Sequence, residues 1–282
     1  MRFKASLLVA IAAGAMSFSS AMADIPSKVR IATDGESPPY SLSKSDGTIE
    51  GFEVEYARAL CTRMALDCSV EVQDFSGMLP ALNAGKFDVI MASMSITKKR
   101  EEVISFSIPY GGTGNAFAVV KGSPLEALPG KDGTLSLTSA DAQARIGALR
   151  QMLKGKVLGV QTSSVSAEFA KTYFKDVADI REYQKSEEIN LDLLAGRVDA
   201  EINGRSFLHN SAKASGFENI VMVGPVLDEG VFGAGVGFGF RKKDTDLKAK
   251  FDAAIRASAA DGSLKALSLK WFGFDTTPSG LR

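Results

Sequence analysis

Short apolar segments alternate with amphipathic segments along most of this chain. The apolar segments 29–32 and 157–160 are typical of buried parallel strands, and helix-like segments follow further along the chain at 76–85 and 186–196. A regular alternation of strands and helices is the pattern of α/β layers. The sequence therefore predicts parallel sheets that are flanked by helices.

One motif occurs twice in the chain. The pattern L-x-A-G-[K/R]-x-D is found at 82–88 and again at 193–199, about 110 residues later. In both copies it ends a helix-like segment, so the glycine falls where a positive φ closes a helix, and a short strand follows. The repeat predicts two lobes of similar build. Because ligands of such sheets bind beyond the carboxyl ends of the strands, we expect the site in the cleft between the lobes.

Two segments are candidate crossings between the lobes. Residues 106–117 are rich in glycine and contain a proline, and residues 223–225 are a candidate for the return. We therefore expect lobe 1 to comprise 24–112 and 222–282, and lobe 2 to comprise 113–221.

The last part of the chain combines alternating glycines with two helical patterns. Residues 231–240 predict a strand of lobe 1, and 244–271 predict one or two amphipathic helices. The glycines do not form a dinucleotide site, because no G-x-G-x-x-G opens a helix there. We expect neither a cofactor nor a metal ion, since the chain offers no cluster of metal ligands.

The first residues have the layout of a secretory leader. Arg2 and Lys4 precede an apolar run at 5–16, and small residues at 21–23 offer a cleavage site near Ala23. The run is too short to span a bilayer, which needs about 20 residues. No cysteine stands at the cleavage site to carry a lipid. We expect a soluble, exported protein that is free in the periplasm.

The charge balance argues against nucleic acid as a partner. Removing Arg2 and Lys4 with the leader from 33 basic residues leaves 31 against 33 acidic residues, a net charge of about −2. Nucleic-acid-binding domains carry basic patches, and none is present. We expect a small-molecule partner and a monomer.

Cys61 and Cys68 are the only cysteines. In an exported protein such a pair usually forms a disulfide. The alternative, a catalytic or metal-binding pair, is disfavoured because the spacing is not CxxC and the single histidine, His209, is distant in sequence.

Polar residues follow the predicted strands of both halves. Arg100, with Ser93 and Ser95, comes after the first copy of the repeat, and an arginine fork can hold a carboxylate through two parallel hydrogen bonds. An arginine in this position is alternatively a solvated or salt-bridged residue. In the second half, Thr162, Ser163 and Ser164 precede a predicted helix, whose free N–H groups suit an anion or are capped by these serines. Arg100 and the serine turn would together hold one α-carboxylate.

Several segments resemble one protein family. The motifs T-D-x-x-x-x-P, G-F-E-V-E, M-A-S-M-S-I-T-K-K-R, S-F-S-I-P-Y and L-S-L-K-W-F, with the repeated pattern, extend from Thr33 to Phe272. They resemble the polar amino acid and opine branch of periplasmic solute-binding proteins, and are most similar to the nopaline- and octopine-binding members. The resemblance implies the two-lobed type II fold, closure around the ligand, delivery to the membrane permease of an ABC importer, and a disulfide between Cys61 and Cys68.

The resemblance also implies roles for individual residues. Asp34 would face the basic end of the ligand, and Phe75 would form an apolar wall. Two positions depart from the amino-acid binders, since Ser37 replaces an aromatic lid and Gly204 replaces the Asp that pairs with an α-ammonium. The expected ligand-binding residues are Asp34, Glu36, Ser37, Phe75, Ala92, Ser93, Ser95, Arg100, Thr162, Ser163, Ser164, Asn203 and Gly204.

These departures leave three functions open. In the first, the ligand is an opine. Its second arm would occupy the space at Gly204, Asn203 would hydrogen-bond this arm, and Arg205 would pair with its carboxylate if it points into the cleft. In the second, Glu36 takes over the ammonium contact and the ligand is a free basic amino acid. In the third, the protein is a dehydratase on the same fold, but such an enzyme needs an acid or base in the cleft, and only Glu36 is a candidate. We therefore expect a binding protein and not an enzyme. A protein that presents a ligand to a chemoreceptor or sensor would have the same sequence features.

Overall fold

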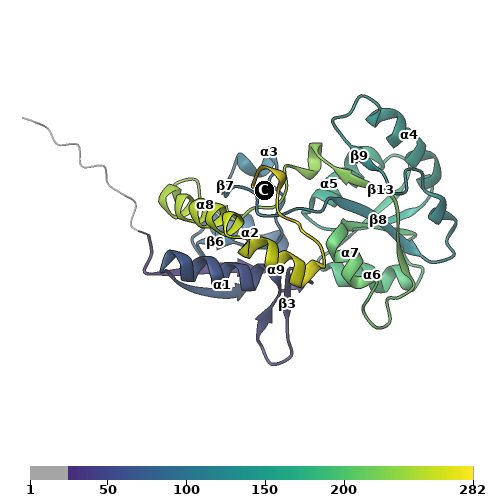
Figure 1. Ribbon diagram of the computed structural model, residues 1–282. Helices are drawn as coiled ribbons and strands as arrows, with labels where there is room; N and C mark the ends of the chain where they lie inside the picture. The colour runs from purple at the N-terminus through teal and green to yellow at the C-terminus, as the bar shows by residue number, and fades with distance from the viewer. Residues whose placement is uncertain (1–24, 282) are drawn as a thin grey trace, which may run out of the picture.

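The computed structural model describes residues 25–281, and the expected leader at 1–23 lies outside these residues. Two lobes lie side by side (Figure 1). Lobe 1 combines the N-terminal part of the chain, in purple and blue, with the C-terminal part, in yellow. Lobe 2 is formed by the middle of the chain, in teal and green.

Lobe 1 contains a sheet with the strand order β5-β1-β6-β14-β7. The first three of these strands are parallel, and β14 runs antiparallel to both of its neighbours. A small antiparallel sheet, β2-β3-β4, extends from this lobe. The strands are β1 (Lys28–Thr33), β2 (Glu36–Ser37), β3 (Ser41–Ser43), β4 (Ile49–Glu50), β5 (Asp67–Val72), β6 (Val89–Ile90), β7 (Ser105–Phe106) and β14 (Gly239–Phe240).

Helices cover the sheet of lobe 1, and α8 and α9 from the end of the chain pack against α1. The aromatic core beneath them includes Phe52, stacked on Tyr56 at 5.7 Å, and Tyr110, which lies 4.6 Å from Phe238 between ring centroids. The helices are α1 (Phe52–Met64), α2 (Met78–Asn83), α3 (Lys98–Glu101), α8 (Thr245–Ala260) and α9 (Ser263–Phe272), with short 3-10 turns at Phe75–Gly77 and Ser279–Leu281.

Lobe 2 contains a sheet with the strand order β11-β10-β12-β8-β13-β9. β10 is parallel to both of its neighbours, and β8 is antiparallel to both of its own. The strands are β8 (Asn115–Val120), β9 (Thr134–Ser136), β10 (Val157–Gln161), β11 (Asp179–Tyr183), β12 (Ala200–Gly204) and β13 (Ile220–Asp228). The helices are α4 (Ala142–Leu153), α5 (Val165–Tyr173), α6 (Ser186–Leu194) and α7 (Arg205–Ser211), with 3-10 turns at Pro124–Ala127 and Gly230–Phe232.

The repeated motif has the same structural role in both lobes. Asp88 accepts the backbone N–H of Arg30 at 3.0 Å, and Asp199 accepts the backbone N–H of Val157 at 2.8 Å. Each aspartate directly precedes a strand that pairs in parallel with the strand containing its donor. The predicted internal repeat is therefore confirmed, and its aspartate anchors a loop to the neighbouring strand.

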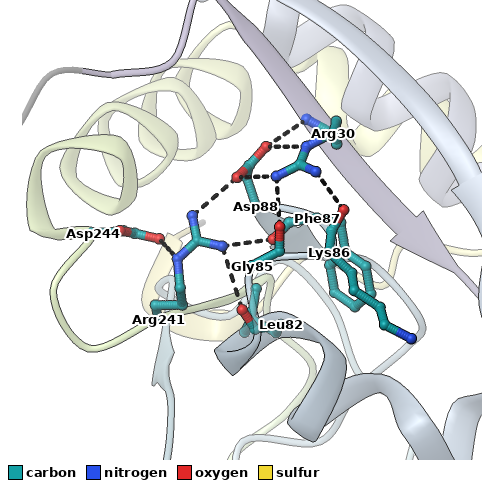
Figure 2. A network of polar contacts seen from close by, with 8 residues as sticks. All are labelled: Arg30, Leu82, Gly85, Lys86, Phe87, Asp88, Arg241 and Asp244. Atoms are coloured by element: carbon teal, nitrogen blue, oxygen red, sulfur yellow. Dashed lines mark hydrogen bonds and ion pairs between the residues drawn. The ribbon is translucent and has the colours of Figure 1, made fainter.

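In lobe 1 this anchor is extended into a larger network (Figure 2). Asp88 lies between two guanidinium groups, with Arg30 Nε at 3.0 Å and Arg241 Nη2 at 2.9 Å. Arg241 also forms an ion pair with Asp244 at 2.7 Å. Because Arg241 directly follows β14, the network attaches the C-terminal part of the chain to the N-terminal part.

The two crossings between the lobes lie side by side. Val236 on the return path donates its backbone N–H to Gly111 O at 2.9 Å, and Tyr110 donates to Val236 O at 3.1 Å. Gly235 has φ +97°, and a Cβ at this position would lie 2.8 Å from Gly111 O. The close contact between the crossings therefore requires glycine at position 235.

The return crossing differs from the prediction. Residues 223–225 lie inside β13, which pairs with β8 on both sides of a register shift between Val223 and Leu227. Gly224 and Pro225 thus belong to a bulge and not to a crossing, and the chain leaves the sheet of lobe 2 only after Asp228. The strand expected at 231–240 is limited to β14, while the helices expected at 244–271 are confirmed as α8 and α9.

The disulfide between Cys61 and Cys68 is present. Its S–S distance is 2.05 Å and its Cα–Cα distance is 6.3 Å, and it joins the end of α1 to β5. Across residues 25–281 there is no helix with the length and apolar character needed to cross a membrane. The same residues contain no group of side chains that could hold a metal ion.

Candidate functional site

A cavity of about 770 Å³ lies between the lobes and is lined by residues of both. Its walls come from the ends of β1, β6 and β12, from the start of α5, and from the two crossings. The strands contribute at their carboxyl ends, as predicted. Ten of the expected site residues line this cavity: Asp34, Ser37, Phe75, Ala92, Ser93, Ser95, Arg100, Ser164, Asn203 and Gly204.

Arg100 is a buried cation at the interface of the two lobes. It is held by α3, which begins after Thr97, whose side chain accepts the backbone N–H of Arg100 at 3.3 Å. Its guanidinium donates to Ser95 O at 3.0 Å and to Ser163 O at 3.1 Å, and it lies over the ring of Phe75 at 5.6 Å. Burial lowers the pKa of Arg100 to about 10. A desolvated guanidinium with N–H groups to spare is well suited to bind a carboxylate.

Asp34 provides a fixed negative charge on the wall of lobe 1. Its carboxylate accepts hydrogen bonds from Ser37 Oγ at 2.5 Å and from Ser41 Oγ at 2.7 Å, and the residue is 5% exposed. Both serines therefore hold the carboxylate in one orientation. Ser37, which occupies the position of the expected aromatic lid, acts as a support for Asp34 within the cavity wall.

Lobe 2 contributes a helix start and an amide. Ser164 caps α5, because its side chain accepts the backbone N–H of Ala167 at 3.1 Å. Asn203 Nδ2 donates to Ser186 Oγ at 3.0 Å and to Glu201 Oε1 at 2.8 Å. Both N–H groups of the amide are therefore used within lobe 2, and its oxygen accepts the backbone N–H of Gly204 at 2.8 Å, so that Asn203 offers the cavity one remaining acceptor lone pair and no donor.

Three expected site residues lie outside the cavity lining. Glu36 forms an ion pair with Lys185 of lobe 2, and Thr162 donates to Glu182 at 3.2 Å. Ser163 has φ +61°, and its carbonyl oxygen receives a hydrogen bond from Arg100. The serine turn therefore contacts the arginine directly, so that only Ser164 of this trio reaches the cavity.

Sequence reasoning missed several lining residues, among them Tyr40, Asn115, Gln161 and Ser166, together with part of the C-terminal segment. Tyr40 is 8% exposed and belongs to the aromatic core, so no local pattern distinguishes it from other core tyrosines. Arg205, which the sequence suggested as a partner for the second carboxylate of an opine without including it among the expected site residues, is exposed at the start of α7 and lines the cavity. The structure gives Arg205 no ion pair with any residue in 25–281.

The lobes are in contact around this cavity. Besides the contact of Arg100 with Ser163, Lys99 of lobe 1 lies 3.2 Å from Glu168 of lobe 2, and Ser76 donates to Gln184 at 3.2 Å. Glu36 of lobe 1 and Lys185 of lobe 2 form a further ion pair between the lobes. The two lobes are thus joined by direct polar contacts in this structure.

Comparison with known proteins is consistent with this architecture. The chain matches the family model of bacterial extracellular solute-binding proteins, family 3, over residues 29–274. The octopine-binding periplasmic protein of Rhizobium meliloti is 41% identical over 270 residues, covering 89% of this chain and 92% of the relative. The L-arginine-binding protein of Pseudomonas aeruginosa is 34% identical over 275 residues, covering 96% of this chain and 97% of the relative.

Solved structures have the same fold. An ancestral arginine-binding protein bound to arginine superimposes with a TM-score of 0.74 at 28% identity, covering 89% of this chain and 100% of that chain. A periplasmic His/Glu/Gln/Arg/opine family-binding protein from Silicibacter pomeroyi in complex with lysine gives 0.71 at 30% identity, covering 89% and 99%. These likenesses confirm the type II fold. Because the family model spans nearly all described residues, the chain belongs to family 3 of the bacterial extracellular solute-binding proteins and is a binding protein and not an enzyme.

Proposed function

We propose that this protein is the periplasmic substrate-binding component of an ABC importer and that its ligand is an opine. An opine is an amino acid whose α-nitrogen carries a second arm with a carboxylate. The observation that carries the proposal is that two arginines from different lobes, Arg100 and Arg205, line one cavity. Each can bind one carboxylate of such a ligand, while Asp34 faces a basic side chain.

The surroundings of Gly204 support this ligand. A Cβ at Gly204 would meet no atom within 4 Å, so this part of the cavity has room for a second arm. No carboxylate stands at position 204 to pair with a primary ammonium. The opine nitrogen has fewer N–H groups, and the acceptor oxygen of Asn203 suits one of them.

The octopine-binding relative supports the same class of ligand, whereas the arginine-binding relative supports the alternative. The octopine-binding protein is 41% identical to this chain, and the arginine-binding protein is 34% identical. The alternative ligand is a free basic amino acid, which would require a new partner for its ammonium. Glu36, the candidate for that role, is bound to Lys185 and lies outside the cavity lining. A free amino acid would therefore have to place its ammonium near another lining carboxylate, such as Asp228 or Glu229.

Location and partners follow from the leader and from the relatives. Cleavage near Ala23 would release a monomeric protein into the periplasm. The lobes would close by moving about the crossings at 111–114 and 229–236. A ligand bound to both lobes would stabilise this closed state, and the closed protein would dock on permease subunits.

A ligand panel tests the proposal. Purified protein is mixed with octopine, nopaline, arginine, lysine, ornithine or histidine, and the melting temperature is measured, since a tight ligand in excess adds about 3–4 kcal/mol to the free energy of unfolding. We expect the largest shift with an opine. Small-angle scattering should then show a smaller radius of gyration in the presence of that ligand. Stabilisation by free arginine or histidine with none by either opine would overturn the ligand assignment.

A further inference from the structure

A buried carboxyl group lies directly behind the cavity wall of lobe 1. Glu53, the second residue of α1, is 0% exposed. Its Oε1 accepts the backbone N–H of Ser93 at 2.7 Å and the hydroxyl hydrogen of Tyr110. Its Oε2 has no hydrogen-bond partner among the described residues. A buried polar atom without a partner destabilises the fold, so the presence of Glu53 calls for a compensating role.

The first contact of Glu53 supports an unusual turn in the binding site. Ser93 lines the cavity and has φ +41°, in the left-handed region that residues other than glycine rarely adopt. Such a conformation persists only where the surroundings hold it in place. The hydrogen bond to Glu53 fixes the backbone N–H of Ser93 toward the interior of lobe 1, and so determines how Ser93 faces the ligand.

The second contact reaches the crossings between the lobes. Tyr110 is 0% exposed and directly precedes Gly111, where the first crossing begins. Its backbone N–H donates to Val236 O of the return crossing at 3.1 Å. A single oxygen atom of Glu53 therefore joins the turn at Ser93 to the segment about which the lobes would move.

We propose that Glu53 is a positioning residue for ligand binding: it holds the Ser93 turn in its binding geometry and couples this turn to the crossings, without touching the ligand. The inference rests on the proposed function only in taking this cavity as the ligand site. It does not depend on which ligand is bound.

The role requires an acceptor oxygen and not a negative charge. Burial, together with the nearby charge of Asp34, raises the pKa of Glu53 to about 8, so the neutral form predominates near pH 7. The carbonyl oxygen of the neutral acid accepts both hydrogen bonds, and so does the amide oxygen of glutamine. Glu53→Gln should therefore preserve the function that Glu53→Met removes.

The experiment measures ligand dissociation constants by calorimetry, with octopine as the probe or, if octopine does not bind, whichever panel compound stabilises the parent most. We expect Glu53→Met to bind at least about tenfold more weakly, and Glu53→Gln to stay within about threefold of the parent. Tyr110→Phe should weaken binding by about two- to fivefold, because it keeps the Ser93 contact and removes the link to the crossings. Glu55→Gln serves as the matched control, since Glu55 is on the same helix but contacts Lys270 and Trp271.

A double-mutant cycle separates positioning from general damage to the fold. Glycine adopts a positive φ freely, so Glu53→Met should weaken binding clearly less in a Ser93→Gly background than in the parent. Equal weakening in both backgrounds would overturn the proposal. So would a folded Glu53→Met variant that binds within about threefold of the parent.

One measurement needs neither ligand nor variant. The backbone N–H of Ser93 should be strongly protected from hydrogen exchange in the parent protein, although it lies in a turn at a cavity. Exchange at the rate of an exposed loop amide would overturn the proposal even if Glu53→Met failed to fold. If no panel compound bound the parent while Ser93 was protected, the ligand assignment would fail and the positioning contact would stand.

Discussion

Arg100 of lobe 1 donates a hydrogen bond to the carbonyl oxygen of Ser163 in lobe 2 over 3.1 Å, so a candidate ligand-binding side chain also joins the two lobes. Arg100 is 9% exposed, and its guanidinium lies over the ring of Phe75. Ligand binding and lobe closure therefore share one group. A substitution at this position should impair both.

Replacing Arg100 should abolish most of the affinity. Removing one partner of a desolvated charge pair costs about 2–5 kcal/mol, so Arg100→Ala should raise the dissociation constant at least about thirtyfold. Arg100→Lys should fail as well, because it keeps the charge and loses the planar fork. Calorimetry with the preferred ligand checks both variants. Binding within about threefold of the parent by either one would contradict the assignment.

Arg205 should distinguish an opine from a free amino acid. If it pairs with the second carboxylate, Arg205→Gln should weaken opine binding by about tenfold or more, equivalent to about 1.4 kcal/mol. A free basic amino acid has no second carboxylate, so its affinity should change by less than about threefold. Titration of the variant with octopine and with arginine measures the difference. Equal losses for both ligands would show that Arg205 acts on the fold of the cleft and not on the second arm.

Glu36 should have only a small effect on binding. It forms a partly exposed ion pair with Lys185 across the lobes, and such pairs contribute about 0–1 kcal/mol. Glu36→Gln should therefore raise the dissociation constant by less than about fivefold, and added salt should reduce the difference between the two proteins. If Glu36 instead held the ligand ammonium, Glu36→Gln would lose more than about 2 kcal/mol of binding free energy.

Glu201 should make the stability of the protein depend on pH. Burial raises the pKa of Glu201 from 4.5 to about 8 in the folded state. Between these values the folded protein keeps a proton that the unfolded chain has released, so the free energy of unfolding should fall as the pH rises through this window. Glu201→Gln removes this contribution, which is on the order of a few kcal/mol.

The variant should therefore gain stability relative to the parent between pH 5 and about pH 8.5, as measured by urea unfolding at each pH. In the Glu201→Gln variant the free energy of unfolding should still fall to some extent as the pH rises, because the pKa of Glu53 is also raised to about 8. Glu187→Gln, an exposed change on α6, is the control. If the difference in the free energy of unfolding between variant and parent stayed constant from pH 5 to about pH 8.5, Glu201 would already be ionised in the folded protein at pH 5.

The sequence predicted the features that depend on local pattern. The repeated L-x-A-G-[K/R]-x-D motif identified two related lobes, because each copy must end a helix and anchor the following strand through Asp88 or Asp199. Arg100 was found because its place after a buried strand agreed with the resemblance to the solute-binding family, whereas an arginine in that place alone is more often solvated or salt-bridged. Others of the ten expected residues that line the cavity, among them Asp34 and Phe75, were found through the family resemblance and not through local pattern.

Features that depend on three-dimensional packing were not accessible in this way. Gly224 and Pro225 look like a break in a strand, but pairing of β13 with β8 on either side keeps them in the sheet as a bulge. Ser163 sits in a promising motif, yet its φ of +61° directs its carbonyl toward Arg100. The role of Tyr40 arises from residues distant in sequence, since its nearest polar partner is Ser206 in lobe 2.

The split composition of lobe 1 determines the order in which the chain can mature. β14 lies between β6 and β7 in the sheet, and Arg241 beside it completes the contacts of Asp88. A chain that emerges N-terminus first therefore cannot finish lobe 1 until its last 50 or so residues have appeared, whereas lobe 2 is complete in sequence well before that. Lobe 2 should be the first half to resist protease as the chain emerges, and a truncation before β14 should leave lobe 1 without a stable core.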